Sequence, residues 1–246
     1  MFIGGLQKFT LLDYPGKVSA VIFTMGCNFR CPFCHNPELV NPKEIDYENG
    51  VKEEDILKFL NSRKGDLDGV CITGGEPTLQ LGLAKFAEKI KDMGFLVKVD
   101  TNGSHPNIMK NLVENELVDY VAIDIKTIPE KYKILTNEED IIEKIEKSIK
   151  IIINNKTQLE LRTTVVPGIV DICDFDKIIQ WINNIDKKVF SKLSRYSIQN
   201  FRPNKTLDDS FKNIKPHSKE ELEKVAGKIG KYCKNVTVLD SKDRVC

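Results

Sequence analysis

The sequence predicts an α/β fold built on a mainly parallel sheet. Short apolar runs alternate with longer amphipathic ones, glycine or polar clusters follow the first four apolar runs, and no internal repeat interrupts the order. Such alternation implies parallel strands joined by right-handed crossovers. Two layouts fit it, an open doubly wound sheet and a partial (β/α) barrel. In both layouts an active site forms at the carboxyl ends of the strands.

The expected strands are short apolar runs, most of them rich in Val and Ile. The first of them, VSAVIFT, leads directly into a cysteine-rich segment, and the second, LDGVCIT, leads into two glycines. The strands span residues 18–24, 67–73, 95–100, 118–125, 160–166 and 196–200, with a short terminal strand at 236–239.

The expected helices are segments in which apolar residues recur every three or four positions. Segment 78–93 shows this period and stops at Gly94, a residue that commonly ends helices. Ser218, followed by acidic residues, predicts a capped start for the last helix. The helices span residues 52–61, 78–93, 106–116, 137–153, 175–185 and 218–233.

Composition limits the class of protein. The 246 residues are 41% hydrophobic and 30% charged, and the net charge of +1 gives no bulk attraction to nucleic acid or anionic membrane. No apolar run reaches the length of a membrane span, and the N-terminus lacks the pattern of a secretory signal. We therefore expect one cytoplasmic domain over residues 1–246, with its core at about 18–200 and a helix and short strand at 218–240, and neither a membrane nor a direct nucleic-acid partner.

Three of the seven cysteines, Cys27, Cys31 and Cys34, form a C-x3-C-x2-C group directly after the first strand. Thiolates suit zinc or iron–sulfur clusters. A structural zinc site normally has four protein ligands, and His35 would point away from its neighbour Cys34 on an extended chain. A 4Fe–4S cluster bound by three thiolates has one open iron. A zinc knuckle and three unrelated core thiols are the alternatives.

The segment TGGEP, residues 73–77, follows the second strand. It is compatible with a simple turn in which Pro77 opens a helix. Gly74 and Gly75 also let a ligand approach the backbone, and we expect Glu76 to be free to accept from an ammonium group. A valine at position 75 should then block the ligand while sparing the cysteines.

Charged residues lie in three of the predicted strands. Asp100 and Asp124 would face each other across the barrel mouth, and like charges so close need a cation or a proton. Lys126 is the alternative source of that charge. Arg162 lies in an otherwise apolar strand, which requires an anionic partner, and a salt bridge to Glu160 or Asp124 is one option.

The remaining cysteines and histidines receive no functional assignment. Cys71 lies inside a strand and is expected to be a small core residue. We expect His105 and His217, near helix starts, to be exposed to solvent. Cys173, Cys233 and Cys246 lack C-x-x-C spacing.

The cysteine motif resembles that of the radical S-adenosylmethionine superfamily. His35-Asn36-Pro37 after the last cysteine is similar to the activating enzymes of glycyl-radical enzymes. The opening GGLQKFTLLDYPGKVSAVIFTMGCNFRCPFCHNPEL resembles the long form of the activating proteins of anaerobic ribonucleoside-triphosphate reductases. The resemblance covers most of the chain and is strongest in residues 1–130.

The resemblance implies a partial (β/α)6 barrel and a 4Fe–4S cluster on Cys27, Cys31 and Cys34. It implies reductive cleavage of S-adenosylmethionine to methionine and a 5′-deoxyadenosyl radical, which abstracts a hydrogen atom. It also implies a monovalent cation at Asp100 and Asp124. Gln199 or Asn200 stands where some activases have a histidine that touches the ribose, which leaves that contact open. The cofactor-binding residues that the resemblance implies are Phe33, Gly74, Gly75, Glu76, Pro77, Asp100, Thr101, Asn102, Asp124, Lys126, Arg162 and Gln199.

The implied partner is a glycyl-radical enzyme, most specifically an anaerobic ribonucleotide reductase, with flavodoxin or ferredoxin as electron donor. Two other functions remain open from the sequence. One is radical chemistry on a small molecule, as in a deazapurine-forming synthase. The other is a non-catalytic iron–sulfur or zinc binding module.

Overall fold

The computed structural model describes residues 1–239, so that Cys246 and the last residue of the predicted unit 218–240 lie outside the described part. One eight-stranded sheet runs in the sequential order β1 to β8. The first strand pairs antiparallel with the second, and all later pairs are parallel. The strands are β1 (Ile3–Thr10), β2 (Ser19–Thr24), β3 (Gly69–Gly74), β4 (Leu96–Thr101), β5 (Tyr120–Asp124), β6 (Gln158–Val165), β7 (Leu193–Asn200) and β8 (Val236–Leu239).

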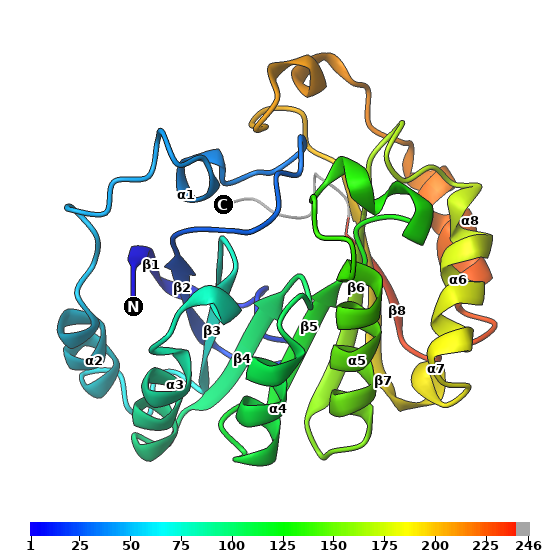
Figure 1. Ribbon diagram of the computed structural model, residues 1–246. Coiled ribbons are helices and arrows are strands. Elements are labelled where there is room, and N and C mark those ends of the chain that lie inside the picture. The colour runs from blue at the N-terminus through cyan, green and yellow to red at the C-terminus, as the bar shows by residue number, and fades with distance from the viewer. Residues whose placement is uncertain (240–246) are drawn as a thin grey trace.

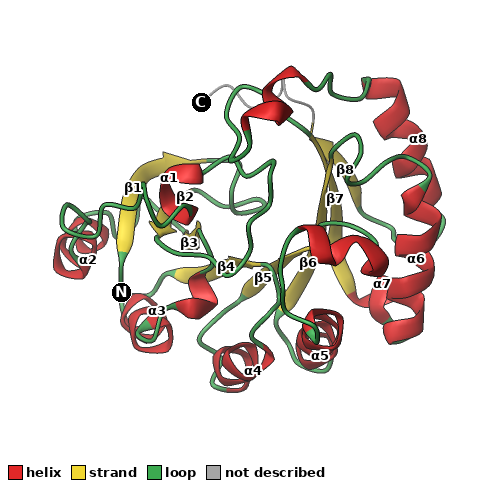
Figure 2. Cartoon of the chain, turned by 45° about the horizontal axis from the view of Figure 1, so that its top comes forward, coloured by secondary structure: helices red, strands yellow, loops and turns green. Residues whose placement is uncertain are grey.

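Figure 2 shows the sheet as an arc with the main helices on its outer side. The strand order never reverses, so the predicted parallel α/β fold is confirmed as a partial barrel, and the doubly wound layout is wrong. The α-helices are α1 (Pro37–Val40), α2 (Glu53–Asn61), α3 (Leu83–Asp92), α4 (Pro106–Glu114), α5 (Ile141–Ile153), α6 (Asp174–Ile185), α7 (Val189–Lys192) and α8 (Lys219–Ile229). Short 3-10 turns lie at Pro77–Leu79 (η1), Pro129–Ile134 (η2) and Asp209–Asn213 (η3).

Two local features differ from the sequence prediction. Strand β1 was not predicted, because its sequence IGGLQKFT contains two glycines and lacks alternation, and it lies at the sheet edge with mixed exposure. The helix expected at 78–93 is split into η1 and α3. The break occurs at Gln80, whose backbone is extended and whose amide Nε2 donates to the carbonyl of Met25 at 2.7 Å.

The apolar core lies between the outer face of the sheet and the helices. Each main helix places a fully buried side chain against it, and removal of this apolar surface from water is the main force that holds the helices there. Examples, in helix order, are Ile56, Phe86, Met109, Ile149, Ile178 and Val225.

The inner face of the sheet is polar by contrast. Because side chains alternate along a strand, residues in parallel register share a face. The register pairs Cys71 with Lys98, Lys98 with Tyr120, and Asp124 with Arg162. The barrel interior therefore carries charged groups that the helical side of the sheet does not.

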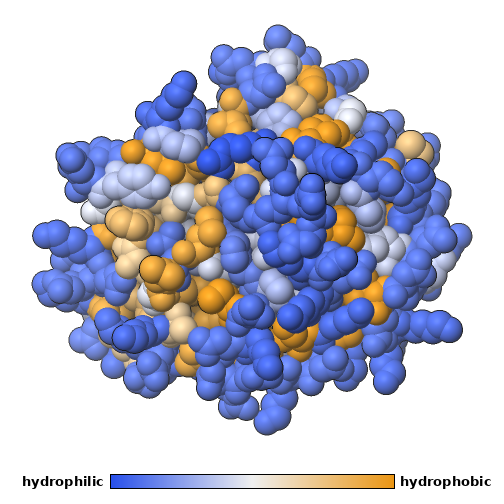
Figure 3. Space-filling model, in the orientation of Figure 1, coloured by the Kyte–Doolittle hydropathy of each residue, from blue (hydrophilic) through white to orange (hydrophobic). Residues whose placement is uncertain are grey.

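The loops that follow β2 to β6 gather at one end of the arc (Figure 1). Hydrophilic side chains dominate the face shown in Figure 3, and apolar ones form patches mainly on its left half. None of the helices within residues 1–239 combines the length and the apolar character that a membrane span requires.

Candidate active site

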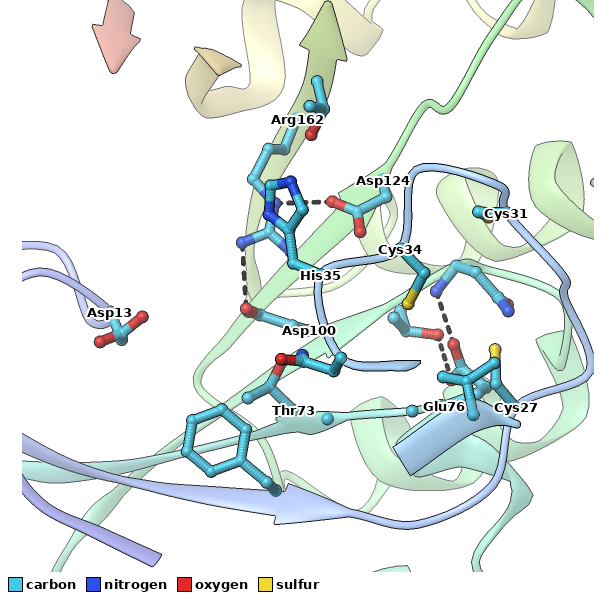
Figure 4. Close-up of a pocket in the computed structure, with 18 of the residues that line it drawn as sticks. Asp13, Cys27, Cys31, Cys34, His35, Thr73, Glu76, Asp100, Asp124 and Arg162 are labelled. Carbon is cyan, nitrogen blue, oxygen red and sulfur yellow. Dashed lines mark hydrogen bonds and ion pairs between the residues drawn. The ribbon is translucent and has the colours of Figure 1, made fainter. Parts of the chain in front are cut away.

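A cavity of about 680 Å³ opens at the carboxyl ends of the parallel strands. Strand β1 and the loop after it form one wall. The loops after β2 to β5 and side chains of strands β2 to β7 form the rest. Figure 4 shows that side chains far apart in sequence point into this space. All but one of the predicted site residues line it. They are Cys27, Cys31, Phe33, Cys34, Gly74, Gly75, Glu76, Asp100, Thr101, Asn102, Asp124, Lys126, Arg162 and Gln199.

The three cysteines of the loop lie together on one side of the cavity (Figure 4). Cys31 is buried, Cys27 and Cys34 are half-buried, and all three are free thiols. Burial raises the pKa of Cys27 to about 12, with the Glu76 carboxylate adding to the effect, and burial raises the pKa of Cys31 to about 11. Burial likewise raises the pKa of Cys34. The thiols are thus protonated at neutral pH, and a soft metal centre has to displace those protons to bind.

The donor set fits an iron–sulfur cluster better than one metal ion. Three thiols from one loop share a cavity wall, and this wall faces a large open space. Within residues 1–239, no group of three or more His, Cys, Asp or Glu side chains is arranged to hold a single metal ion.

Gly74 and Gly75 allow two backbone segments to touch. Gly74 has φ +112°, and a Cβ there would lie 2.3 Å from the amide nitrogen of Thr24. A Cβ on Gly75 would lie 2.0 Å from the carbonyl oxygen of Gly26, next to the first cysteine. The glycines thus fit the loop after β3 against the cysteine loop itself, which is a packing role that the sequence did not reveal.

Glu76 is not free, which corrects the sequence expectation. Its side chain is 1% exposed. One carboxylate oxygen accepts from the amide of Thr78 at 3.0 Å, from the Thr78 hydroxyl at 2.5 Å and from the Thr101 hydroxyl at 2.7 Å. The other accepts from the amide of Asn102 at 2.7 Å. Glu76 therefore ties the loop after β3 to the loop after β4.

Arg162 bridges the two acids at the ends of β4 and β5 (Figure 4). Its Nε donates to Asp124 at 2.6 Å and its terminal nitrogen donates to Asp100 at 3.0 Å. Lys126 donates to the second oxygen of Asp124 at 3.1 Å, and Lys98 pairs with the second oxygen of Asp100. The chain's own cations thus neutralise the two carboxylates, as one alternative from the sequence held.

The cations also control the titration of these acids. Burial alone would raise the pKa of Asp124, but the Arg162 guanidinium and the Lys126 ammonium more than offset it and hold that pKa well below its usual value. Arg162 and Lys98 lower the pKa of Asp100 in the same way against its burial. Both groups are therefore carboxylates at neutral pH.

Several other sequence expectations are resolved. Pro77 is buried in η1 and is not among the residues that line the cavity. Gln199 lines the cavity, whereas Asn200 turns to donate to the carbonyl of His217 at 3.0 Å. The expected exposure of His105 is wrong, because its ring is half-buried and its Nδ1 lies 3.0 Å from the Thr78 hydroxyl.

The same correction applies to His217. Its side chain is half-buried near Asp171 and Glu221, not solvent-exposed. Cys71 is fully buried in β3, as predicted, but its sulfur lies 3.7 Å from the Lys98 ammonium, so its surroundings are not purely apolar.

The sequence interpretation missed one wall of the cavity and one buried charge. The wall consists of Gln7, Phe9, Thr10, Leu11, Leu12 and Asp13. These residues belong to the edge strand β1 and the loop after it, and neither carries a binding motif. The segment LLDYPG in that loop is a signal that could have pointed to this wall. The buried charge is Lys98, which the reasoning applied to Arg162 would also have found, because a lysine inside an apolar strand needs an anionic partner.

Comparisons with known proteins place this architecture. Residues 21–182 match the Radical SAM superfamily. A protein of Methanocaldococcus jannaschii, named provisionally as a glycyl-radical enzyme activating enzyme, is 37% identical over 96% of this chain and 95% of its own length. The pyruvate formate-lyase-activating enzyme of Clostridium pasteurianum is 27% identical over 95% of this chain and 97% of its own.

Solved structures agree on the fold. SuiB of Streptococcus suis, in its complex with the precursor peptide SuiA, aligns with a TM-score of 0.64 at 14% identity, over 89% of this chain and 47% of that one. This chain therefore spans about half the length of that structure. Coproporphyrinogen III oxidase (HemN) of Escherichia coli, described as a radical SAM enzyme, aligns with a TM-score of 0.58 at 12% identity, over 90% of this chain and 54% of that one.

These matches decide the family of the chain. The chain belongs to the Radical SAM superfamily and, within it, to the family of glycyl-radical enzyme activating enzymes. Membership implies a 4Fe–4S cluster and S-adenosylmethionine as cofactors.

The first prediction concerns the contact between the two loops. Gly75→Ala should lower the free energy of unfolding by about 1–3 kcal/mol, because its methyl group overlaps the Gly26 carbonyl. It should also reduce the iron retained after anaerobic reconstitution, since the displaced backbone adjoins Cys27. We therefore predict that a larger residue at 75 affects the cysteines as well, which differs from the expectation from sequence.

The matched control is Gly227→Ala in α8, where a Cβ would have no atom of residues 1–239 within 4 Å beyond the helix's own backbone. Urea denaturation and iron analysis of the three proteins decide the matter. Wild-type stability and iron content in Gly75→Ala would show that the loops tolerate the added methyl.

The second prediction concerns Arg162. Arg162→Met should lower the free energy of unfolding at pH 7 by about 3 kcal/mol, because the buried carboxylate of Asp100 and the half-buried carboxylate of Asp124 lose a shared partner. The deficit should shrink as the pH falls towards about 4, because burial then raises both carboxyl pKa values in the variant and the folded variant takes up protons that the folded wild type does not.

Denaturation at several pH values measures this difference. Arg63→Met removes an exposed arginine 3.6 Å from Asp66 and should change little at any pH. A deficit in Arg162→Met that does not vary between pH 7 and pH 4 would contradict the proposed compensation.

Proposed function

We propose that this protein activates a glycyl-radical enzyme by removing a hydrogen atom from a glycine Cα of that partner, and that the partner is an anaerobic ribonucleotide reductase. The observation that supports this proposal most strongly is the composition of the cavity. Three thiols and the loop of Gly74 and Gly75 meet there with a charged floor and an apolar outer wall. The floor consists of Asp100, Asp124, Lys126 and Arg162, and the apolar residues of the wall are Phe9, Leu11 and Leu12. The similarity over nearly the whole of a relative named for glycyl-radical enzyme activation supports the proposal. The opening segment supports the choice of reductase by its resemblance to the long-form activators.

Cys27, Cys31 and Cys34 would hold the cluster, whose fourth iron is left for the cofactor. When bound, the cluster supplies one electron to S-adenosylmethionine, giving methionine and a 5′-deoxyadenosyl radical. Phe33, which is 6% exposed and lines the cavity between two of the cysteines, would pack against the cofactor. We further propose flavodoxin or ferredoxin as the external one-electron donor.

The charged floor would orient the cofactor's amino-acid group. Lys126 and Arg162 line the cavity and carry cationic nitrogens suited to a carboxylate. Backbone groups of the loop at Gly74 and Gly75 are the partners we propose for the amino group, since the Glu76 carboxylate already accepts four hydrogen bonds from the protein. The Oε1 of Gln199 accepts from the Thr164 hydroxyl at 3.2 Å, and its amide nitrogen would donate to a ribose hydroxyl.

The outer wall of the cavity suits a protein substrate. Phe9, Leu11 and Leu12 line the cavity and are 58%, 62% and 47% exposed. Exposed apolar side chains at a cavity mouth are typical of sites that bind another macromolecule. A glycine loop of the partner would reach the radical by passing over this wall, which a small-molecule substrate would not need.

The third prediction tests this function directly. Anaerobic incubation of the reconstituted protein with an anaerobic ribonucleotide reductase, S-adenosylmethionine and a reductant should give a glycyl-radical doublet by electron paramagnetic resonance. Cys27→Ala, Cys31→Ala and Cys34→Ala should each abolish the doublet and reduce bound iron, because each removes one cluster ligand.

Cys173→Ser is the matched control, because Cys173 is exposed and does not line the cavity. It should keep both iron and radical formation. A doublet with pyruvate formate-lyase but not with the reductase would overturn the choice of partner. Formation of 5′-deoxyadenosine with no doublet on any glycyl-radical enzyme would overturn the proposed function and favour a small-molecule substrate.

A further inference from the structure

Lys98 is a fully buried charge for which the proposed chemistry has no use. It lies in β4 with 2% of its side chain exposed, and the strand register places it between Cys71 and Tyr120 on the inner face of the barrel. Its ammonium pairs with Asp100, lies 3.7 Å from the Cys71 sulfur and lies 5.8 Å from the centre of the Tyr120 ring. A lysine so deeply buried is costly unless its charge is compensated.

Each carboxylate oxygen of Asp100 and Asp124 has a cationic partner. Lys98 and Arg162 take the two oxygens of Asp100, and Arg162 and Lys126 take the two oxygens of Asp124. The nearby acid Glu160 accepts from Arg195 at 2.9 Å and from the Tyr120 and Ser197 hydroxyls, and it also interacts electrostatically with Lys98 and Arg162. Among the described residues, the four cations Lys98, Arg162, Lys126 and Arg195 and the three anions Asp100, Asp124 and Glu160 form one row of charges, whose net charge is +1.

This donor set does not fit a monovalent cation. Alkali ions, like other hard cations, need oxygen ligands free to surround them. Here each of the four oxygens already accepts from a positively charged nitrogen. The row also carries one net positive charge, so an added cation would be repelled. The cation that the resemblance implies at Asp100 and Asp124 thus disagrees with the side chains present.

We propose that the Lys98 ammonium replaces that cation and makes the cofactor site of this protein independent of sodium and potassium. Lys98 pairs with Asp100 and fixes its carboxylate. Asp100 in turn holds the Arg162 guanidinium in the position from which Arg162 reaches Asp124. The single excess positive charge of the row remains for an anionic group of a ligand. Lys98 is a positioning residue, since it does not line the cavity. The inference rests on the proposed function for the part that concerns S-adenosylmethionine.

The test compares potassium chloride, sodium chloride and tetramethylammonium chloride at equal ionic strength. Two quantities are measured, the melting temperature of the cluster-free protein and the dissociation constant of S-adenosylmethionine for the reconstituted protein. For the wild type, both should be the same in all three salts, the dissociation constant within about twofold. Affinity at least about fivefold tighter in potassium or sodium would overturn the proposal.

The variant Lys98→Met should acquire the dependence that the wild type lacks. Asp100 then has one unshared oxygen facing a space that an alkali ion can enter. Potassium or sodium should raise the melting temperature of Lys98→Met and tighten its cofactor binding severalfold relative to tetramethylammonium. Lys98→Arg, which keeps the positive charge, should behave like the wild type. Lys91→Met, which removes a half-buried lysine paired with Asp119 at 2.6 Å, is the matched control and should stay independent of the cation.

The outcomes separate the two proposals. A folded Lys98→Met protein that is indifferent to the cation and binds the cofactor as the wild type does would show that Lys98 only packs the barrel, and would overturn the inference. If that variant does not fold, the wild-type comparison decides alone. If no S-adenosylmethionine binds in any salt, the proposed function fails, and the melting temperatures of the cluster-free wild type still test the inference.

Discussion

Two carboxylates at the ends of adjacent parallel strands, one buried and one half-buried, impose the strongest physical constraint on this structure. Asp100 and Asp124 lie at one rim because parallel strands in register bring their carboxyl ends to the same edge. Burial of two like charges so close is unfavourable unless cations compensate them. Arg162 meets both, so one side chain from β6 joins the carboxyl ends of β4 and β5. The shape of the barrel mouth depends on this bridge.

A second set of contacts builds the wall that carries the cysteines. The amides of Gly75 and Glu76 donate to the carbonyls of Thr24 and Gly26 at 2.8 and 2.7 Å. The Glu76 carboxylate then accepts from the loop after β4. Backbone contacts with the loop after β3 therefore position the cysteine loop. Through Glu76 the same loop contacts the end of β4, so that the three cysteines and the charged floor are held by one connected set of contacts. Preorganised surroundings of this kind are what cofactor chemistry requires of a protein.

The sequence predicts the fold and the location of the site well, because both follow from local patterns. Apolar runs and helical periods identify seven of the strands, and a group of three cysteines after a strand identifies the cavity wall. The sequence does not show which donors a buried group meets. Glu76 looks free as part of a turn, yet its four acceptor bonds come from residues on two loops. Gly75 looks adapted to a ligand, but the nearest neighbour of its missing Cβ is protein backbone. Strand β1 lacks a regular period because its pairing with β2 has two register irregularities, and only its place beside the cavity shows its importance.

The central claim is that S-adenosylmethionine binds an open iron of a cluster held on the rim by three thiolates. Electron paramagnetic resonance of the anaerobically reduced protein, recorded before and after addition of S-adenosylmethionine, tests this claim most directly. The account predicts a clear change in the cluster signal on addition, followed by formation of 5′-deoxyadenosine. A reduced cluster whose spectrum is unchanged at saturating S-adenosylmethionine, with no 5′-deoxyadenosine formed, would contradict it.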